Sequence, residues 1–254
     1  PMTAFNDTLQ HEMYGNHPMT TRIKADMIDQ IDYNRIMEMY KNRFQEAGDF
    51  TFLFVGNINL EEAKPLIETY LGGLPTINRK ENFQDIKLDR RKGNHKNVFE
   101  KQLETPKATV ISVISGNCEY NLKNILLMSM LSQTMDMVYT ETIREKEGAS
   151  YGIRAIGELS KYPKDEALLQ IIFDTDPAKR EKMEQIVMSE LQKAAQNGPR
   201  PEHLAKVKEF LLKQHLENAK ENGYWLGQLN EYYWNNVDMN TDYEKLVNEI
   251  TVED

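Results

Sequence analysis

The sequence predicts an α+β protein in which long helices cover a mostly antiparallel sheet. One observation is that strand-like stretches come in pairs separated by short turns, as antiparallel strands do. A second is that long stretches with helical periodicity follow them and end at glycine or proline. The third is that these elements gather in the second part of the chain. Grouped strands and grouped helices are typical of a two-layer α+β domain.

The composition describes a protein with enough apolar material for a core. The chain has 254 residues, of which 40% are hydrophobic and 28% charged, so it allows one large domain or two of ordinary size. A net charge of −9 without a long basic run argues against a nucleic-acid partner. The longest apolar runs are far too short for a membrane span. Cys118 is the single cysteine, which excludes an internal disulfide and a thiolate zinc cluster.

The first part of the chain predicts one strand between two helices. Residues 1–20 are polar and without clear periodicity, which indicates a loop. Apolar residues over Thr21 to Ala47 recur at helical spacing, with a break near Tyr33. Asp49 to Asn57 is the strongest strand of the chain, and its nearly continuous apolar residues predict cover on both faces. These elements hold too few strands to close a sheet.

A helix and a linker follow. Asn59 with Glu62 three residues later predicts a capped helix start, and Pro65 is expected either to kink this helix or to delay its beginning. Residues 75–97 are charged and contain few apolar side chains, which is typical of a linker between domains.

The domain prediction follows from this linker. We expect residues 1–74 to be the truncated remainder of an α+β domain that borrows strands from chain outside this sequence. We expect residues 98–254 to form a C-terminal α+β domain. Both ends of the sequence look cut, and Thr251 to Asp254 has the pattern of a helix start.

The second part begins with a hairpin pattern and a long helix. Val98 to Glu104 and Ala108 to Ile114 predict two strands, and Asn121 to Glu147 predicts a buried helix because it is apolar on most sides. The remaining expected elements are strands at Tyr151–Leu159 and Glu166–Phe173, a helix started by Asp176 and Pro177, a helix from Pro201, an aromatic helix from Tyr224 to Trp234 whose rings are expected to pack, and a capping box at Thr241–Glu244.

The end of the predicted long helix places two polar side chains at one edge of the sheet. Arg144 lies in its last turn, Gly148 just past its end, and Tyr151 at the start of the next strand. Each has a structural explanation, because a cation favours a helix C-terminus, glycine ends helices, and tyrosine is a normal strand residue. From physical chemistry alone, this structural interpretation is preferred over a functional one.

No complete catalytic or metal-binding motif is present. His11, Glu12 and His17 form the one local cluster of metal-capable side chains, but the two histidines are six residues apart, whereas one helical face requires a spacing of three or four. We interpret them as surface residues, and a lone metal-binding domain remains a third hypothesis. His203 and His215 lie on a charged helical stretch and are interpreted as solvated.

The order of three stretches resembles the pitrilysin/insulinase family of inverted zinc metalloproteases. The stretches are Phe50 to Pro75, Ile143 to Ile153, which contains R-E-K-x-G-x-x-Y, and Phe173 to Lys208. The resemblance covers nearly the whole chain and is nearest to the C-terminal half of the long bacterial members.

This resemblance implies a clamshell whose halves each hold two similar α+β domains around a closed chamber. It places zinc and its H-x-x-E-H motif in the N-terminal half, so no cofactor or metal and no catalytic residue is expected in this chain. Arg144 and Tyr151 match the family's arginine and tyrosine that bind backbone carbonyls of the substrate. Both residue types suit that role, because arginine is always charged and tyrosine donates to an oxyanion.

The resemblance implies the substrate-binding C-terminal half of a bacterial zinc endopeptidase, inactive by itself because the H-x-x-E-H motif is absent. Its expected partners are a peptide or unfolded polypeptide and either the N-terminal half of the same protein or a partner subunit. The alternative is a non-catalytic partner or scaffold subunit of a metalloprotease-like complex. The bacterial periplasm and the cytoplasm both remain open as its location.

Overall fold

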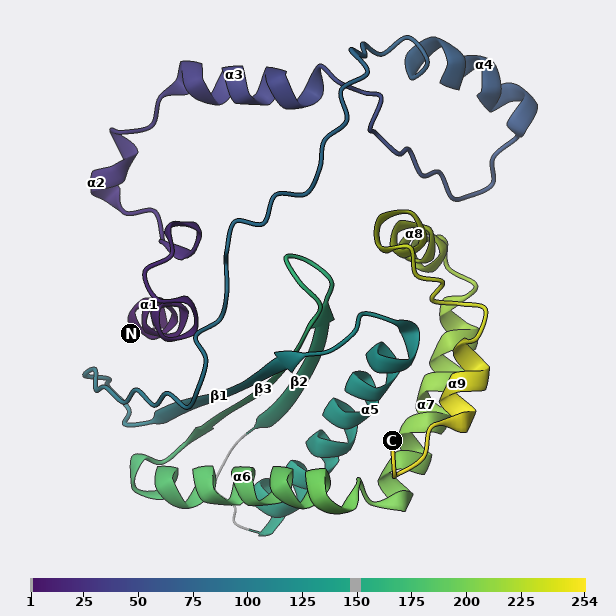
Figure 1. The fold of residues 1–254 in the computed structure, drawn as a ribbon. Coiled ribbons are helices and arrows are strands. Elements are labelled where there is room, and N and C mark those ends of the chain that lie inside the picture. The colour runs from purple at the N-terminus through teal and green to yellow at the C-terminus, as the bar shows by residue number, and fades with distance from the viewer. Residues whose placement is uncertain (1, 147–151) are drawn as a thin grey trace. The chain divides into compact units, whose positions relative to one another are not determined.

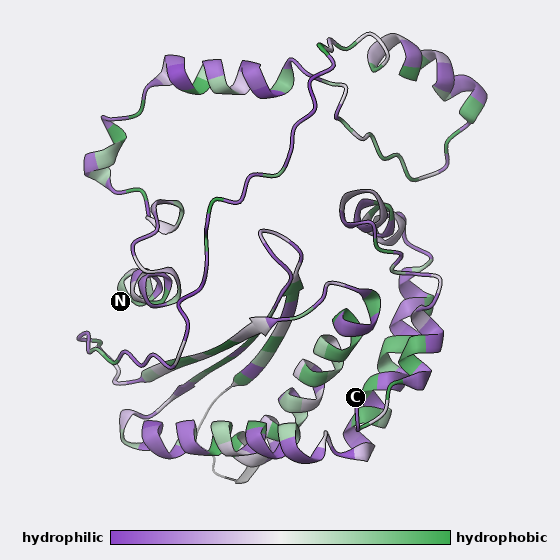
Figure 2. Cartoon of the chain, viewed as in Figure 1, coloured by the Kyte–Doolittle hydropathy of each residue, from purple (hydrophilic) through white to green (hydrophobic). Residues whose placement is uncertain are grey.

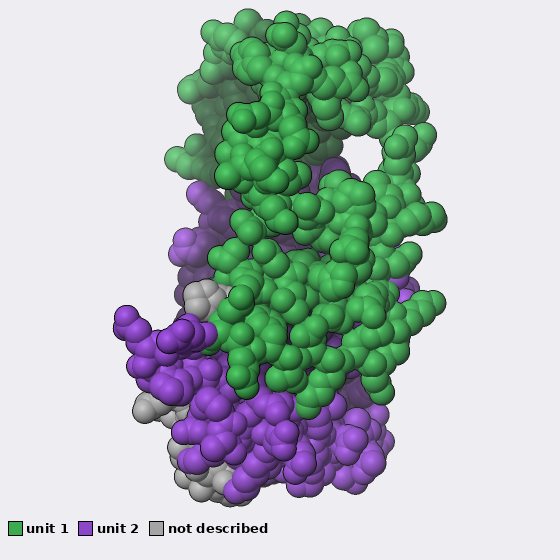
Figure 3. All heavy atoms as spheres, turned by 90° about the vertical axis from the view of Figure 1, so that its left-hand side faces the viewer, with its two compact units in different colours: residues 1–101 green, residues 102–254 purple. Residues whose placement is uncertain are grey.

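A computed structural model describes residues 2–146 and 152–254 of the chain, and describes residues 144–146 by their backbone alone. The chain forms two compact units, Pro1–Lys101 (unit 1) and Gln102–Asp254 (unit 2), which Figure 3 distinguishes by colour. The predicted linker, residues 75–97, therefore belongs to unit 1.

Unit 1 consists of helices joined by extended chain (Figure 1). They are α1 (Met2–Tyr14), the short 3-10 helix η1 (Pro18–Thr20), α2 (Ala25–Ile28), α3 (Tyr33–Phe44) and α4 (Leu60–Tyr70). The expectation of a loop over residues 1–20 is wrong, because α1 fills most of that range. Gly15 ends this helix: it adopts a φ of 65°, and its N–H donates to the carbonyl of His11 at 2.7 Å.

The caps of α3 and α4 show how sequence sets these helix starts. The predicted break falls between α2 and α3, where the side chain of Asp32 accepts from the backbone N–H of Arg35. Asn59 caps α4 in the same way, accepting from the N–H of Glu61 at 3.0 Å. Pro65 lies inside α4 without delaying its start.

The strand predicted at Asp49–Asn57 is not formed. Residues 50–55 are extended but belong to no sheet within the described chain. The side chains of Phe50, Phe52 and Phe54 are exposed, and no apolar residue is buried in the described part of unit 1. A strand needs a neighbouring strand for its backbone hydrogen bonds, and unit 1 offers none. The prediction of a strand at Val98–Glu104 is also wrong, because none of these residues belongs to the described sheet. Figure 2 shows apolar residues distributed along α3, α4 and the segment between them.

Unit 2 contains a three-stranded antiparallel sheet, which confirms the predicted α+β class. Its strands are β1 (Ala108–Asn117), β2 (Ile153–Ser160) and β3 (Glu166–Thr175), in the order β1-β3-β2. Phe173 of the central strand faces Val110 on one side and Ile153 on the other. β1 and β2 are therefore the edges of this sheet.

Helices cover one face of the sheet and then extend beyond it (Figure 1). In chain order they are α5 (Leu122–Tyr139), the π-helix η2 (Thr140–Lys146), the 3-10 helix η3 (Pro177–Lys179), α6 (Arg180–Asn197), α7 (Pro201–Asn218), α8 (Asn222–Asn230), the π-helix η4 (Glu231–Asn235) and α9 (Tyr243–Glu249). Asp176 caps η3 as expected, accepting from the N–H of Ala178 at 2.7 Å.

The capping box predicted at Thr241–Glu244 is wrong. Asp242 is the N-cap of α9 and makes no side-chain capping bond. The hydroxyl and the N–H of Thr241 both donate to the carboxylate of Asp238 instead. The Thr241 hydroxyl, which the predicted capping box would use, therefore donates to the Asp238 carboxylate three residues earlier.

Two hydrophobic clusters hold unit 2 together. The first lies between the sheet, α5 and α6, and includes Met135, Tyr139, Ile171, Phe173 and Val187. The second lies between α5, α7 and α9, and includes Leu126, Met130, Val207, Leu211 and Val247. Because α5 contributes to both clusters, the predicted burial of this helix on most sides is confirmed.

The aromatic residues of η4 do not pack as expected. Tyr232, Tyr233 and Trp234 are 53%, 61% and 69% exposed. Trp234 meets Tyr162 of the β2–β3 hairpin edge to face, with ring centroids 6.2 Å apart, but neither ring is buried. Helical spacing of aromatic residues alone therefore did not identify a core face here.

Candidate functional site

Arg144 lies in η2, the wide helical turn between α5 and β2. Tyr151 lies outside the described residues, and of Arg144 only the backbone is described. The structure thus places one member of the predicted pair at the expected junction. Contact between the two side chains, and their role in binding substrate, stay predictions.

The junction departs from the regular α-helix that its sequence predicts. The α-helical pattern ends at Tyr139, and residues 140–146 continue as a π-helix. At the changeover the hydroxyl of Thr142 donates to the carbonyl of Val138 at 2.7 Å, a side-chain bond to the preceding turn that is known to bend helices. π-Helical turns occur frequently at functional sites. The turn that carries Arg144 shares this geometry with η4, so the π-helix makes it a candidate site without identifying it.

Asp136 ties the start of β2 to α5. Its Oδ1 accepts from the backbone N–H of Ala155 at 2.5 Å. Burial raises the pKa of this carboxyl, against the opposing effects of the Ala155 hydrogen bond and the charge of Arg154. β2 is an edge strand, and the N–H of Ala155 points away from β3. A further strand added at this edge would need that N–H as a hydrogen-bond donor, but the N–H already donates to Asp136.

Glu141 of η2 is held by two residues of the α7 start. Its carboxylate accepts from Arg200 Nη1 at 2.5 Å and contacts His203 Nε2 at 3.0 Å. Burial by itself would raise the pKa of Glu141, but the hydrogen bonds and charges of Arg200 and His203 outweigh it and lower the pKa. Sequence reasoning missed this group because its members lie far apart in the chain and form no local motif.

The two histidines that were interpreted as solvated are not. His203 is only 3% exposed. His215 stacks on Tyr243 with ring centroids 4.2 Å apart, and its Nδ1 lies 3.0 Å from the hydroxyl of Tyr224. The charged residues next to them in the sequence indicated exposure, but both rings lie on the side of α7 that packs against other residues.

The predicted metal-capable cluster in unit 1 does not form a metal site. His11 contacts Asn16, and His17 contacts the carbonyl of Ile86. Glu12 accepts from Arg91 at 2.8 Å and from Asn97 at 3.0 Å. Each side chain therefore has a different partner, and within residues 2–146 and 152–254 no three metal-capable side chains are grouped.

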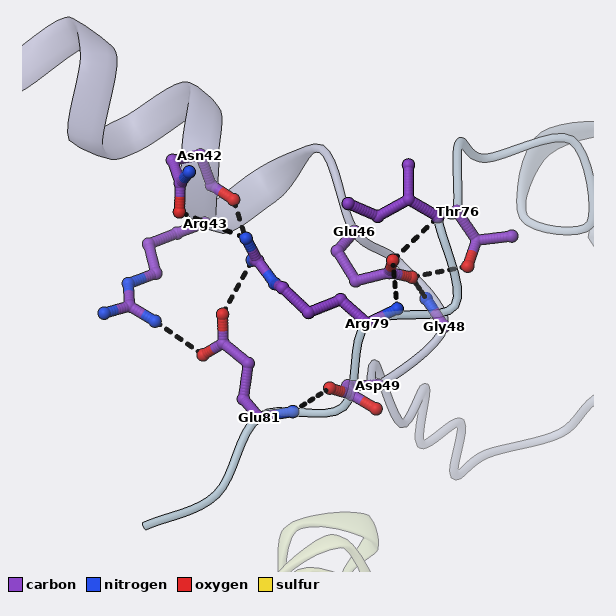
Figure 4. Close-up of polar contacts among 9 residues, drawn as sticks. Asn42, Arg43, Glu46, Gly48, Asp49, Thr76, Arg79 and Glu81 are labelled. Carbon is purple, nitrogen blue, oxygen red and sulfur yellow. Dashed lines mark hydrogen bonds and ion pairs between the residues drawn. The ribbon is translucent and has the colours of Figure 1, made fainter. Parts of the chain in front are cut away.

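A buried carboxylate in unit 1 joins the end of α3 to the chain after α4 (Figure 4). Glu46 is 2% exposed and accepts from Gly48 N, the Thr76 hydroxyl, Ile77 N and Arg79 N at 2.5 to 3.0 Å. The hydrogen bond from Thr76, with those from Arg79, Gly48 and Ile77, lowers the pKa of Glu46 to about 2. A carboxylate with its acceptors occupied and so low a pKa suits a structural role rather than acid–base chemistry.

Comparison with known proteins identifies the family. A family model described as the peptidase M16 inactive domain matches residues 30–211, well over half of the chain. The chain belongs to the peptidase M16 inactive-domain family. This finding confirms the resemblance to the C-terminal half of pitrilysin/insulinase peptidases and the peptidase-like character of the chain.

Individual relatives of this M16 domain match it in sequence or in structure. A zinc protease PQQL-like protein of Arabidopsis thaliana is 23% identical over 93% of this chain. The periplasmic protease PqqL of Escherichia coli superposes on all of the chain with a TM-score of 0.85 and 18% identity. A peptidase M16 inactive domain from Pseudomonas fluorescens superposes on 97% of it with a TM-score of 0.67 and 18% identity.

The M16 chain spans only part of these relatives. It covers 26% of the Arabidopsis protein, 28% of E. coli PqqL and 59% of the Pseudomonas chain. Among the described helices, none combines the length and the hydropathy needed to cross a bilayer. A match to so small a part of these relatives does not carry the activity of a whole peptidase over to this chain.

Proposed function

We propose that this chain is the substrate-binding part of a zinc endopeptidase, and that it acts beside another part of the protein that carries the metal. The observation that carries the proposal is the position of Arg144 in a wide turn between α5 and an edge strand, within a domain of the M16 inactive type. This turn places the Arg144 backbone between the end of α5 and the edge strand β2 of the sheet.

The chemistry of the predicted pair fits peptide binding. A guanidinium offers several fixed donors and keeps its charge at any working pH, so Arg144 would hold backbone carbonyls of an extended peptide. The phenol of Tyr151 would donate to the oxygen that gains charge as a carbonyl is attacked. Neither group can activate water, so the pair binds and orients substrate.

Zinc would have to be held by residues outside this chain. Within the described ranges no three histidine, cysteine, aspartate or glutamate side chains are grouped, and His17 and Glu12 contact Ile86 and Arg91 instead. They do not fit a zinc site, which needs three or four converging ligands. In this proposal, a metal bound within the described ranges has no part in the reaction.

Kinetics of the full-length protein test the role of the pair. We expect Arg144→Ala and Tyr151→Phe each to lower kcat/KM for an unstructured fluorogenic peptide by about 10- to 100-fold, the range for losing a hydrogen bond to a charged or charging group. Arg35→Ala is the control, because Arg35 is an exposed arginine whose one described ion pair is with Glu38 on the same helix. Unchanged hydrolysis in both junction variants would remove the role proposed for them.

A scaffold function is the second candidate, and the match to a family of inactive domains favours it. It predicts that the full-length protein binds no stoichiometric zinc and hydrolyses no peptide. Zinc analysis of the purified full-length protein separates the two functions, since an endopeptidase must bind about one zinc per active site.

A further inference from the structure

The link between η2 and α7 is built like a support for the turn that carries Arg144. Glu141 lies three residues before Arg144 in the same π-helix. Its two carboxylate oxygens are used separately: Oε2 accepts from Arg200, the residue just before α7, and Oε1 faces His203 in the first turn of α7. One side chain therefore joins the wide turn to the start of another helix.

The histidine of this link is buried in an unusual way. The His203 side chain is 4% exposed, its Nε2 lies 3.0 Å from Glu141, and its Nδ1 has no hydrogen-bond partner in the described part of the chain. A neutral ring that donates from Nε2 leaves Nδ1 as an unpaired acceptor, whereas a charged ring would bury an unpaired N–H. The Glu141 contact is thus the one polar interaction that this buried ring makes there.

We infer that Glu141 is a positioning residue, which Arg200 and His203 hold so that the backbone of the wide turn keeps Arg144 in one fixed position. This inference rests on the proposed function of Arg144 as a substrate-binding residue. Glu141 itself touches no substrate in this scheme and acts through the backbone of η2.

The turn needs a support of its own because the other described contact near it, between Asp136 and Ala155, lies outside η2. On the α5 side, Asp136 fixes the start of β2 through Ala155. Between these points the chain leaves the regular α-helical pattern, and π-helical turns are rare and short. A functional side chain must be held to within about 0.5 Å by supporting contacts to bind productively. The Glu141 link supplies the contact on the α7 side.

A double-mutant cycle in the full-length protein tests whether Glu141 acts through Arg144. We expect Glu141→Ala to lower kcat/KM for an unstructured fluorogenic peptide by about tenfold, and the Arg144→Ala/Glu141→Ala variant to fall within about twofold of Arg144→Ala alone. Glu141→Gln keeps one acceptor oxygen and should lie between wild type and Glu141→Ala. If the fold-losses in kcat/KM of the two single variants multiply in the double variant, the inference is overturned. Independent defects add in free energy, so Glu141 would then not act through Arg144.

Hydrogen exchange provides a readout that does not depend on catalysis. Glu141→Ala should speed amide exchange of residues 140–146 by about tenfold or more, since local opening follows the loss of local contacts. Glu184→Ala is the matched control: Glu184 also pairs with an arginine at 2.5 Å, on α6. Equal protection of residues 140–146 in the two variants would overturn the inference.

The two measurements separate this inference from the proposed function. If Arg144→Ala leaves kcat/KM unchanged, the substrate-binding role of Arg144 is wrong whatever Glu141 does. Exchange of residues 140–146 then still decides whether Glu141 orders the turn. If Arg144→Ala is impaired while Glu141→Ala is not, the proposed function stands and the positioning role fails.

Discussion

Gly157 of β2 lies directly against Met128 of α5. A Cβ atom placed on Gly157 would lie 2.8 Å from the carbonyl oxygen of Met128 and 2.6 Å from its sulfur. A flexible methionine could move its sulfur, but the carbonyl belongs to the helix backbone. The absent side chain therefore sets how closely α5 packs on the sheet.

Replacing this glycine should loosen unit 2. We expect Gly157→Ala to lower the free energy of unfolding by about 1–3 kcal/mol, the usual cost of overpacking. Denaturant unfolding followed by circular dichroism measures the change. Gly116→Ala is the control on the other edge strand, because a Cβ there meets nothing within 4 Å. Equal losses in the two variants would show that the α5 contact is not the cause.

Asp136 should stabilise the folded chain through the hydrogen bond that it accepts from Ala155 rather than through its negative charge. Its pKa is raised in the folded chain, so its favourable contribution is fully present below the ordinary value of 3.8 and is lost as pH rises through the folded pKa. Asp136→Asn keeps an oxygen for Ala155 without the charge, and should be neutral or stabilising at pH 7. Asp136→Ala leaves that N–H without its partner and should cost about 1–3 kcal/mol.

Unfolding of both Asp136 variants at pH 7 and at pH 4 checks this expectation. The advantage of Asp136→Asn over wild type should shrink at the lower pH, where more of the wild-type carboxyl is protonated. An advantage that grows as pH falls would contradict the direction of the pKa shift.

Glu46 should show the opposite pH dependence. Its pKa is lowered to about 2, so its contribution to the folded state is present above the ordinary value of 4.5 and is lost as pH falls towards 2. The amide signals of Gly48, Ile77 and Arg79 should titrate together in NMR spectra, with a midpoint near the lowered pKa. Separate midpoints, or one near 4.5, would rule out the shared carboxylate.

Tyr139 should be sensitive to the loss of a single atom. It is fully buried, and its hydroxyl donates to the carbonyl of Val187 at 3.2 Å. We expect Tyr139→Phe to cost about 0.5–1.5 kcal/mol of unfolding free energy, the usual net value of a buried hydrogen bond. Tyr233→Phe, at an exposed position, should stay within about 0.5 kcal/mol of wild type. Similar values for the two would show that the Val187 bond contributes nothing.

Elements with strong local signals were predicted from the sequence. The hydrophobic pattern placed α5 and β3, and the Asn59 and Asp176 caps mark helix starts where the sequence predicts them. The segment Phe50 to Val55 failed for a physical reason: a strand exists only with a partner, and apolar residues report what a segment could bury rather than what covers it. The α1 helix was missed although Phe5, Leu9 and Met13 recur at helical spacing, because they are few among the polar residues of this range.

The candidate site was predictable only in part. Arg144 could be found because a local motif carries it. Glu141 and His203 could not, because a lone glutamate and a lone histidine 62 residues apart give no local signal, and their pairing depends on how α7 packs against α5. Such supporting contacts are a property of the tertiary fold.

The double membership of α5 has a consequence for how unit 2 comes apart. Residues of α5 belong to both hydrophobic clusters, so moving this helix away from one cluster also exposes the other. Unit 2 should therefore melt as one cooperative body, with a calorimetric enthalpy equal to the van't Hoff enthalpy. Damage to the contacts of α9, at the far side of α5, would then be felt at the turn that carries Arg144.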